Sequence, residues 1–328
     1  MRVLHLSHHD GCHGDLEYVH HRLGIDIERI HYPFGYNMCH DRANDIWNDL
    51  ADRINTFDVV LVSDTAPLSR IILQHMDKFR GHLIIWVCNR FDYKDNVTNN
   101  CGFPDPEYYN LFRNALSSSR VTIIPYTDFE RVHASRAKIN IRHNTIKPLG
   151  LTKREAAPSI VPECIDKSAS YFVPPYHNDR LFALHNRLCD MGFENFDDRY
   201  AGASDLKDFR GIVHVPYAWS NFALFENWQN GVVYAIPSLR FMRNLCREGG
   251  FFWSPPFEYG LLSISEWYAT VNAGNFVYFD SWAELKKTLE HWDIHRRRVK
   301  LVLSVFCEAH VKATLKEWEN VYRGISKV

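Results

Sequence analysis

The sequence predicts an α/β protein with two domains, each built around a parallel β-sheet. Short apolar runs such as Val59–Val62 and Leu83–Val87 end in polar residues, as buried parallel strands do. The chain has 328 residues, about twice the usual length of one domain. A polar, Pro-containing segment at residues 151–168 has the composition of a linker. We therefore expect domains at residues 1–150 and 169–328.

The composition excludes several classes of protein. Hydrophobic residues make up 46% and charged residues 23%, which are ordinary values for a globular chain, and the net charge of -1 gives no basic surface for general nucleic-acid binding. Eight scattered Cys indicate free thiols in a reducing compartment. The start, Met1–Ser7, is too polar for a signal peptide, and no apolar run reaches the roughly 20 residues of a membrane span. We expect a soluble, cytoplasmic protein.

In the first half, the predicted strands alternate with helices. The strands are expected at residues 3–6, 57–64, 82–88 and 121–124, and the helices at 65–79, 108–116 and 128–137. Because the carboxyl ends of parallel strands meet at one edge of a sheet, the polar residues that follow these strands are candidates for a shared site.

The loop after the first predicted strand is rich in histidine. A metal could bind to His8, His9, Cys12 and His13, although these residues are bunched rather than helically spaced. Alternatively, one of His9, His13 or Asp15 acts as an acid or base, because His titrates near neutral pH. The third alternative is a polar loop without chemistry.

Two charged residues follow the strand that ends at Cys88. Arg90 could pair with a phosphate, and Asp92 could accept a proton or orient a hydroxyl. The alternative is that Arg90 and Asp92 pair with each other.

In the second half, a strand at Ala169–Val173 is followed by a turn and a helix predicted from Arg180 to Met191. Later elements are a strand at 276–279, a helix opened by Ser281 in a capping box, and a long helix at 296–322.

The stretch Gly211–Ser238 reads as strand, loop, short helix, glycine stop and strand. Ser220 or Asn221 can cap the helix, Glu226 lies in it, and Gly231 supplies the left-handed residue that ends it. A helix N-terminus at the carboxyl edge of a parallel sheet is where α/β proteins hold phosphates.

This stretch resembles the donor-binding element of sugar-nucleotide-dependent glycosyltransferases of the GT-B fold. The retaining branch of that family carries the pattern E-x-F-G-x-x-x-x-E-A-x-A-x-G-x-P, and Glu226 falls on its second Glu and Gly231 on its Gly. In the family, the second Glu holds the ribose hydroxyls of the nucleotide. The alternative for Glu226 is a solvated helix face.

The stretch also departs from the pattern. Ala218 stands at the first Glu, Ser220 and Asn221 stand at Phe-Gly, and Val233 replaces the Pro. The match therefore favours nucleotide binding and leaves the catalytic mechanism, retaining or inverting, open.

The resemblance implies a GT-B fold: two Rossmann-like domains whose parallel sheets face each other across a cleft, with a helix near the C-terminus that crosses back. The C-terminal domain would bind the donor and the N-terminal domain the acceptor.

The implied donor contacts are Lys147, His177, Asn178, Ser220, Asn221 and Glu226, with Arg90 as a phosphate candidate. For Asn178 a helix cap, and for Lys147 a solvated surface position, are the alternatives. The base would be His9, Asp15 or Asp92, brought to the sugar by closure about residues 151–168.

The function that this resemblance implies is transfer of a sugar from a nucleotide-sugar to a hydroxyl of a glycan or glycoprotein, without a metal or other cofactor. The alternatives are a sugar-nucleotide epimerase or hydrolase on the same fold, and a non-catalytic sugar-nucleotide-binding protein. A further resemblance, to glycosyltransferases of large DNA viruses, is carried by two stretches, Asn89–Tyr93 and Val215–Asn221. Such enzymes would work in host cytoplasm.

Overall fold

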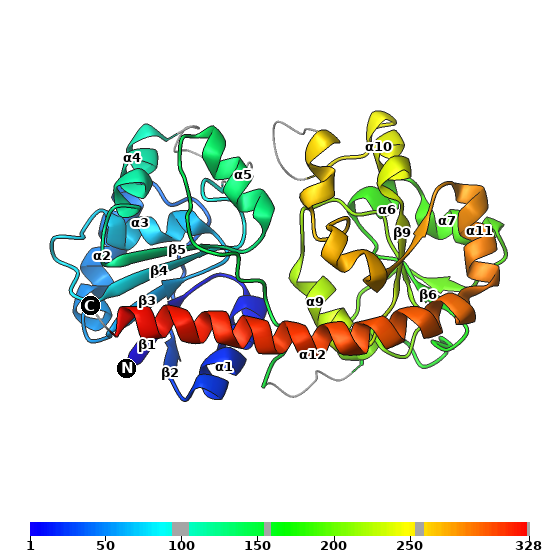
Figure 1. Cartoon of the computed structure of the whole chain (residues 1–328), viewed down its shortest axis with the longest axis horizontal. Coiled ribbons are helices and arrows are strands. Elements are labelled where there is room, and N and C mark those ends of the chain that lie inside the picture. The colour runs from blue at the N-terminus through cyan, green and yellow to red at the C-terminus, as the bar shows by residue number, and fades with distance from the viewer. Residues whose placement is uncertain (94–104, 154–158, 253–258, 327–328) are drawn as a thin grey trace. The chain divides into compact units, whose positions relative to one another are not determined.

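The computed structural model describes residues 1–93, 105–153, 159–252 and 259–326 of the chain (Figure 1). The chain divides into two compact units: unit 1 comprises Met1–Pro148 and Ala313–Val328, and unit 2 comprises Leu149–Lys312. The last helix, α12 (Trp292–Ile325), begins in unit 2 and ends in unit 1. None of the described helices is both long and apolar enough to span a membrane.

Unit 1 is built on a five-stranded sheet in which all neighbouring strands are parallel, in the order β2-β1-β3-β4-β5. The strands are β1 (Arg2–Leu6), β2 (Asp26–Arg29), β3 (Val59–Val62), β4 (His82–Val87) and β5 (Val121–Pro125). All four residues of β3 are buried, as expected for a central parallel strand that is covered on both faces. The sequence analysis found four of these strands and missed β2, which is short and polar.

The helices of unit 1 are α1 (Asp10–Leu23), α2 (His40–Ile54), α3 (Arg70–Leu73), α4 (Pro106–Ala115) and α5 (Asp128–Arg136), with the 3-10 helix η1 (Ala66–Ser69). The helix expected to run to Phe79 is wrong, because α3 ends at Leu73. Hydrogen bonds of the tighter i to i+3 kind, from His75 N to Ile72 O and from Lys78 N to His75 O, turn the chain there.

The end of α12 completes the core of unit 1. The Trp318 ring packs edge-on against Trp86 of β4, with ring centroids 5.6 Å apart. Tyr322 OH lies 2.5 Å from His20 Nε2 of α1. Burial lowers the pKa of His20 to about 4, so this histidine is neutral and belongs to the core.

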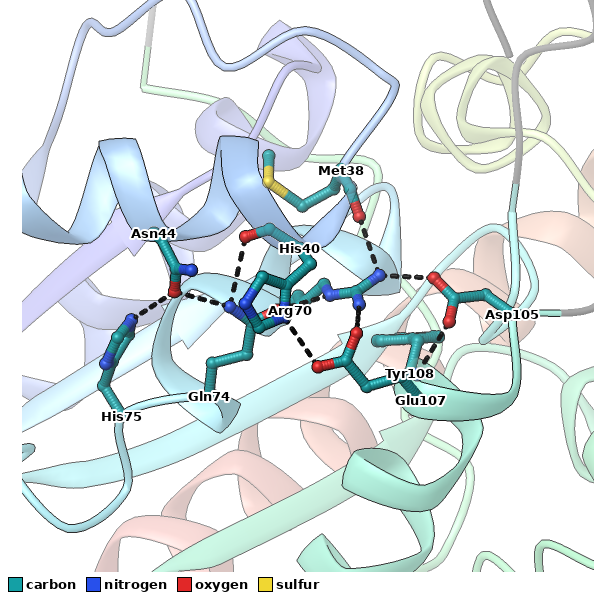
Figure 2. A network of polar contacts seen from close by, with 9 residues as sticks. All are labelled: Met38, His40, Asn44, Arg70, Gln74, His75, Asp105, Glu107 and Tyr108. Carbon is teal, nitrogen blue, oxygen red and sulfur yellow. Dashed lines mark hydrogen bonds and ion pairs between the residues drawn. The ribbon is translucent and has the colours of Figure 1, made fainter. Parts of the chain in front are cut away.

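A buried arginine ties three helices of unit 1 together (Figure 2). Arg70 of α3 is only 2% exposed, and its guanidinium contacts the carboxylates of Asp105 and Glu107 at the start of α4. Its Nε donates to Gln74 Oε1 at 2.5 Å, and the Gln74 amide donates to Asn44 Oδ1 of α2 at 2.8 Å. A buried guanidinium needs this full set of acceptors, so the network fixes α2, α3 and α4 relative to one another.

Unit 2 contains a second five-stranded parallel sheet, in the order β10-β9-β8-β6-β7. Its strands are β6 (Tyr171–Phe172), β7 (Asn195–Phe196), β8 (Ile212–Val213), β9 (Tyr234–Pro237) and β10 (Phe276–Phe279). Numbered within each unit, both sheets have the doubly wound strand order 2-1-3-4-5. The expected fold class, α/β with two Rossmann-like parallel sheets, is confirmed, and two such units in one chain make the fold GT-B-like.

The helices of unit 2 follow its strands. They are α6 (His177–Leu181), α7 (Leu184–Asp190), α8 (Ala203–Leu206), α9 (Phe222–Gln229), α10 (Leu239–Arg247) and α11 (Trp282–Glu290), with the 3-10 helices η2 (Tyr259–Ile264) and η3 (Thr270–Asn275). The single helix expected from Arg180 to Met191 is wrong, because Ala183 adopts a left-handed φ of 48° and separates α6 from α7. The predicted Ser281 cap is confirmed: Ser281 Oγ accepts from Glu284 N at 3.1 Å.

Parts of the segment expected as a flexible linker are attached to unit 2. Lys167 Nζ lies 2.7 Å from Oδ1 of the buried Asp205. Just before this segment, Gly150 has a φ of 70°, and a Cβ there would lie 2.3 Å from the carbonyl carbon of Phe225 in α9. Only glycine permits this close approach of two backbones. Composition did not indicate these contacts, because they depend on partners far away in the sequence.

Candidate functional site

The strand order places a candidate ligand site at the carboxyl ends of β6 and β8. These strands are neighbours in the sheet, with Phe172 paired to Ile212. The chain leaves β6 toward α6 and the outer strand β7, but leaves β8 toward α9 and β9 on the other side. In open α/β sheets, the crevice at such a reversal is where ligands bind.

A buried aspartate–histidine pair links the two segments at this reversal. Asp179 lies in α6 and is 1% exposed, and His214 directly follows β8 and is 2% exposed. His214 Nδ1 lies 2.7 Å from Asp179 Oδ2, while Asp179 Oδ1 accepts from Val215 N at 2.7 Å. Burial raises the pKa of Asp179, and the hydrogen bonds from His214 and Val215 oppose that rise. With Asp179 ionised, Nδ1 of His214 donates to Oδ2, and this contact orients the imidazole ring.

The other ring nitrogen of His214 is not held by a hydrogen bond from the described residues. Its Nε2 is buried and has no hydrogen-bond partner among the described residues. The ring packs against Trp267, with centroids 5.1 Å apart, and against Tyr217 at 6.1 Å. A neutral histidine whose Nδ1 proton is held by a carboxylate presents Nε2 as a proton acceptor. The sequence analysis missed both residues, although a histidine directly after a short strand, at the expected phosphate edge, was a signal for His214.

Asn178 positions the loops around this pair. Its side chain is fully buried, and Nδ2 donates to the carbonyl oxygens of Pro216 and Phe251, each at 2.8 Å. Its Oδ1 accepts from Phe251 N at 3.1 Å. The helix-cap alternative for Asn178 is wrong, because Tyr176 occupies the N-cap position of α6. The amide instead joins the segments that follow β6, β8 and α10.

His177 forms a flat aromatic surface beside Asn178. Its ring stacks on Tyr217 at a centroid distance of 3.9 Å and an angle of 24°. The backbone of His177 is left-handed, with a φ of 54°, a conformation that costs a non-glycine residue about 1 kcal/mol or more. Burial, together with the nearby His214, lowers the pKa of His177. A neutral aromatic surface of this kind suits a nucleobase or a sugar ring.

At the start of α9, the structure distinguishes between the two cap candidates. Asn221 is the cap, because its Oδ1 accepts from Leu224 N at 2.7 Å. Ser220 Oγ is buried and has no hydrogen-bond partner in the described part of the chain. The Ser220 hydroxyl and the positive end of the α9 dipole can together hold an anion.

Glu226 lies one turn further along α9 and is half-buried. Burial raises the pKa of Tyr200, and the negative charge of Glu226 raises it further. Glu226 contributes in the same direction to the raised pKa of Tyr234, for which burial is again the main cause. The charge of Glu226 is therefore felt by both phenols, and with its half-buried position this disfavours the solvated-face alternative.

In unit 1, the histidine-rich stretch after β1 is helical rather than a loop. His9 is the N-cap of α1, and its Nδ1 accepts from Cys12 N at 3.3 Å. His13 and Asp15 lie inside α1, and both are buried. Within the described ranges, no three His, Cys, Asp or Glu side chains are grouped to hold a metal ion, and the cluster proposed from the sequence is not such a group.

Asp92 is buried and lies within hydrogen-bonding distance of a histidine. Its Oδ1 lies 2.8 Å from His133 Nε2, and its Oδ2 accepts from Tyr109 OH at 2.7 Å. Burial raises the pKa of Asp92, but the hydrogen bond and charge of His133, together with the Tyr109 hydrogen bond and the Arg90 charge, outweigh that effect and leave the pKa lowered. Arg90 has a φ of 40°, and its guanidinium lies 5.9 Å from the ring of Tyr93.

Glu130 belongs to the same polar cluster, one turn before His133 on α5. It is 4% exposed, and burial raises its pKa to about 8. Its Oε2 has no hydrogen-bond partner among the described residues, nor does His133 Nδ1. The sequence analysis missed both residues, because nothing in the helix Asp128–Arg136 shows which of its faces meets Asp92.

A cavity of about 510 Å³ lies beyond the ends of β1 and β2 in unit 1. It is lined by Ser7, His8 and residues 29–36, and the His8 ring packs on Tyr36 at a centroid distance of 4.5 Å. Arg29 at its edge pairs with Asp10 at 2.7 Å. Aromatic walls with one cation suit a sugar. The sequence analysis overlooked residues 29–36, although their run of Tyr, Pro, Phe and Gly was a signal.

Lys147 belongs to unit 1, whereas the predicted donor contacts from His177 to Glu226 belong to unit 2. It is half-buried and follows Ile146, whose N–H donates to Pro125 O at 3.0 Å. Its segment therefore runs beside the end of β5.

No protein-family model matches the sequence, and no curated protein matches it. Among solved structures, the UDP-GlcNAc 2-epimerase from Methanocaldococcus jannaschii is similar over 88% of this chain and 92% of its own, with a TM-score of 0.49 and 11% identity. A solute-binding protein of an ABC transporter system from Conexibacter woesei is similar over 72% of this chain and 69% of its own, with a TM-score of 0.28 and 12% identity. At these identities, neither neighbour indicates an activity for this chain.

Proposed function

We propose that this chain is a glycosyltransferase that moves a sugar from a nucleotide-sugar to a hydroxyl of a glycan or glycoprotein, with unit 2 as the donor-binding unit. The observation that carries the proposal is the set of groups at the β6/β8 reversal. The Asp179–His214 pair, with its unpartnered Nε2, lies where the chain leaves these strands, and the capped start of α9 with Glu226 follows on the same segment.

Each group at the reversal has a part in donor binding. The diphosphate would lie at the first turn of α9 and Ser220, whose N–H groups and hydroxyl donate to anions. Glu226 would accept from the ribose hydroxyls. The His177–Tyr217 surface would pack against the base or the sugar. Much of the rate enhancement would come from holding the acceptor hydroxyl against the anomeric carbon.

His214 would act as the general base. Its Nε2 would take the proton of the attacking hydroxyl, and Asp179 would stabilise the resulting imidazolium through the bond to Nδ1. Of the bases expected from the sequence, His9 caps α1, Asp15 is buried within α1, and Asp92 holds His133. The cavity lined by residues 29–36 is the candidate acceptor pocket.

The second candidate function is a sugar-nucleotide epimerase or hydrolase. One observation favours it: the candidate base His214 belongs to the same unit as the donor-binding groups. A base in this position could act on the donor itself or on water, without an acceptor.

Release of nucleoside diphosphate from UDP-, GDP- and dTDP-sugars, with and without glycan acceptors, tests these functions. Release that requires an acceptor supports the transferase, and release without one supports the hydrolase or epimerase. Binding without turnover would leave a sugar-nucleotide-binding protein. Failure of all these donors to bind, measured by calorimetry, would overturn the proposal.

A further inference from the structure

The surface of unit 2 carries a concentration of exposed apolar side chains. The most exposed large apolar side chains of the described residues are Val271, Ile294, Leu301 and Val305, each 68–73% exposed. Three of them lie on α12. Val271 belongs to η3, which reaches the same helix where Gly274 approaches Val302. Single exposed apolar residues are ordinary, but a contiguous group of them marks an interaction surface.

A set of exposed residues on α12 forms a seam along the helix. Its positions alternate steps of four and three residues, the spacing that keeps side chains on one face of a helix. The seam residues, all of them exposed, are Ile294, Arg298, Leu301, Val305, Glu308 and Lys312. The seam thus has an apolar centre, with a cation toward its start and a carboxylate toward its end.

The order of residues in the seam is self-complementary. Its positions are symmetric about residue 303, so an antiparallel second copy brings Leu301 against Val305 of the partner subunit. The same register brings Arg298 opposite Glu308 of the partner subunit. Ile294 then meets the methylene stem of Lys312 of the partner subunit. A parallel copy would instead bring like charges together, at Arg298 and again at Glu308.

We propose that this seam is the two-fold interface of a homodimer, in which α12 of one protomer packs antiparallel to α12 of its partner. A two-fold interface uses the same patch on both subunits, which is what the symmetric order of the seam provides. Within one chain, Glu308 pairs with Lys312 at 2.6 Å. A carboxylate has further acceptor positions, so Glu308 keeps that pair and also accepts from Arg298 of the partner subunit.

The first test is the mass of the full chain in solution, measured by sedimentation equilibrium across a concentration series. The expected result is a dimer of the 38.5 kDa chain. Leu301→Asp should weaken the dimer about a hundredfold or more, because it places a charge in the apolar centre of both copies. The matched control is Leu181→Asp, which changes a leucine that is 52% exposed and lies on α6, outside the seam. The control should leave the dimer unchanged.

The second test reverses charges to establish the orientation. Arg298→Glu and Glu308→Arg should each weaken the dimer about tenfold, because each places like charges opposite one another twice per dimer. The double variant should restore the affinity of the wild type. A wild-type chain that stays monomeric at every concentration would overturn the proposal, and so would a dimer that Leu301→Asp leaves intact. A double variant that is weaker than both single variants would overturn the antiparallel register.

Discussion

The Nδ1 atom of His214 and the Oδ2 atom of Asp179 lie 2.7 Å apart, in a contact that joins residues 35 positions apart in the chain. The contact spans the point where the second sheet reverses its strand order, because Asp179 follows β6 and His214 follows β8. It fixes the orientation of a buried imidazole whose Nε2 has no partner among the described residues. Two predictions concern this site, and two concern buried charged residues of unit 1.

Asp179→Asn should lower turnover of the donor by about a hundredfold or more. An asparagine can still accept from Val215 N through Oδ1, but its amide would donate to His214 Nδ1 and so move the imidazole proton to Nε2. The fold should survive, because the shape and the backbone hydrogen bond are kept. Steady-state kinetics measure the loss, and circular dichroism checks the fold. Full activity in this variant would show that His214 is not the base.

Glu226→Ala should weaken donor binding about tenfold to a hundredfold, which corresponds to roughly 1.5–3 kcal/mol for a carboxylate that accepts from two hydroxyls. Turnover at saturating donor should change much less, because Glu226 binds the nucleotide and not the reacting carbon. Titration calorimetry with the nucleotide-sugar measures the effect. The control is Glu163→Ala, which changes an exposed glutamate of the same unit. Equal affinities in wild type and Glu226→Ala would remove Glu226 from the site.

Glu130→Gln should remove a pH-dependent loss of stability in unit 1. The folded-state pKa of Glu130 is raised from 4.5 to about 8, so folding favours the protonated form. The contribution of Glu130 to the free energy of unfolding is complete below pH 4.5 and is lost as the pH rises to about 8. The loss is about 1.4 kcal/mol for each pH unit between these two values. The variant should therefore gain stability over wild type at pH 8 but not at pH 4.5.

Denaturant unfolding of wild type and Glu130→Gln at both pH values measures this difference. Glu163→Gln is the control, because it removes an exposed carboxyl. A Glu130→Gln variant whose stability falls between pH 4.5 and pH 8 as steeply as that of the wild type would contradict the prediction.

Arg70→Met should destabilise unit 1 by about 3 kcal/mol, because it leaves Asp105 and Glu107 without their cation at a site where the arginine is only 2% exposed (Figure 2). The matched control is Arg53→Met on α2, whose ion pair with Glu28 is about half exposed on both sides. The control should cost less than about 1 kcal/mol. Thermal unfolding compares the two variants, and similar losses in both would show that the Arg70 network contributes no more than a surface pair.

Sequence patterns were sufficient where local chemistry decides the structure. Buried runs such as Val59–Val62 formed central strands, because their residues are apolar on both faces. Asn221 and Ser281 cap helices through bonds to residues three positions away. The α/β class with parallel sheets followed from the order of such elements, and the expectation of a GT-B fold came from the resemblance around Glu226. Very short strands were harder, because the two residues of β7 give no periodic signal.

The candidate site depended on contacts that the sequence does not show. Asp92 looked like a base or a partner of Arg90, but the fold supplies His133 and Tyr109 from other helices and occupies both of its oxygens. Asn178 looked like a cap, yet its bonds go to residues 38 and 73 positions away.

The sequence by itself determined the class of each segment and the edge of the sheet where polar groups gather, since both depend on short-range periodicity and chain direction. Only the tertiary structure decided which of those groups are paired and which remain available. Pairing depends on the distances between segments such as those that carry Asp179 and His214, and these distances are set by the order of strands in the sheet.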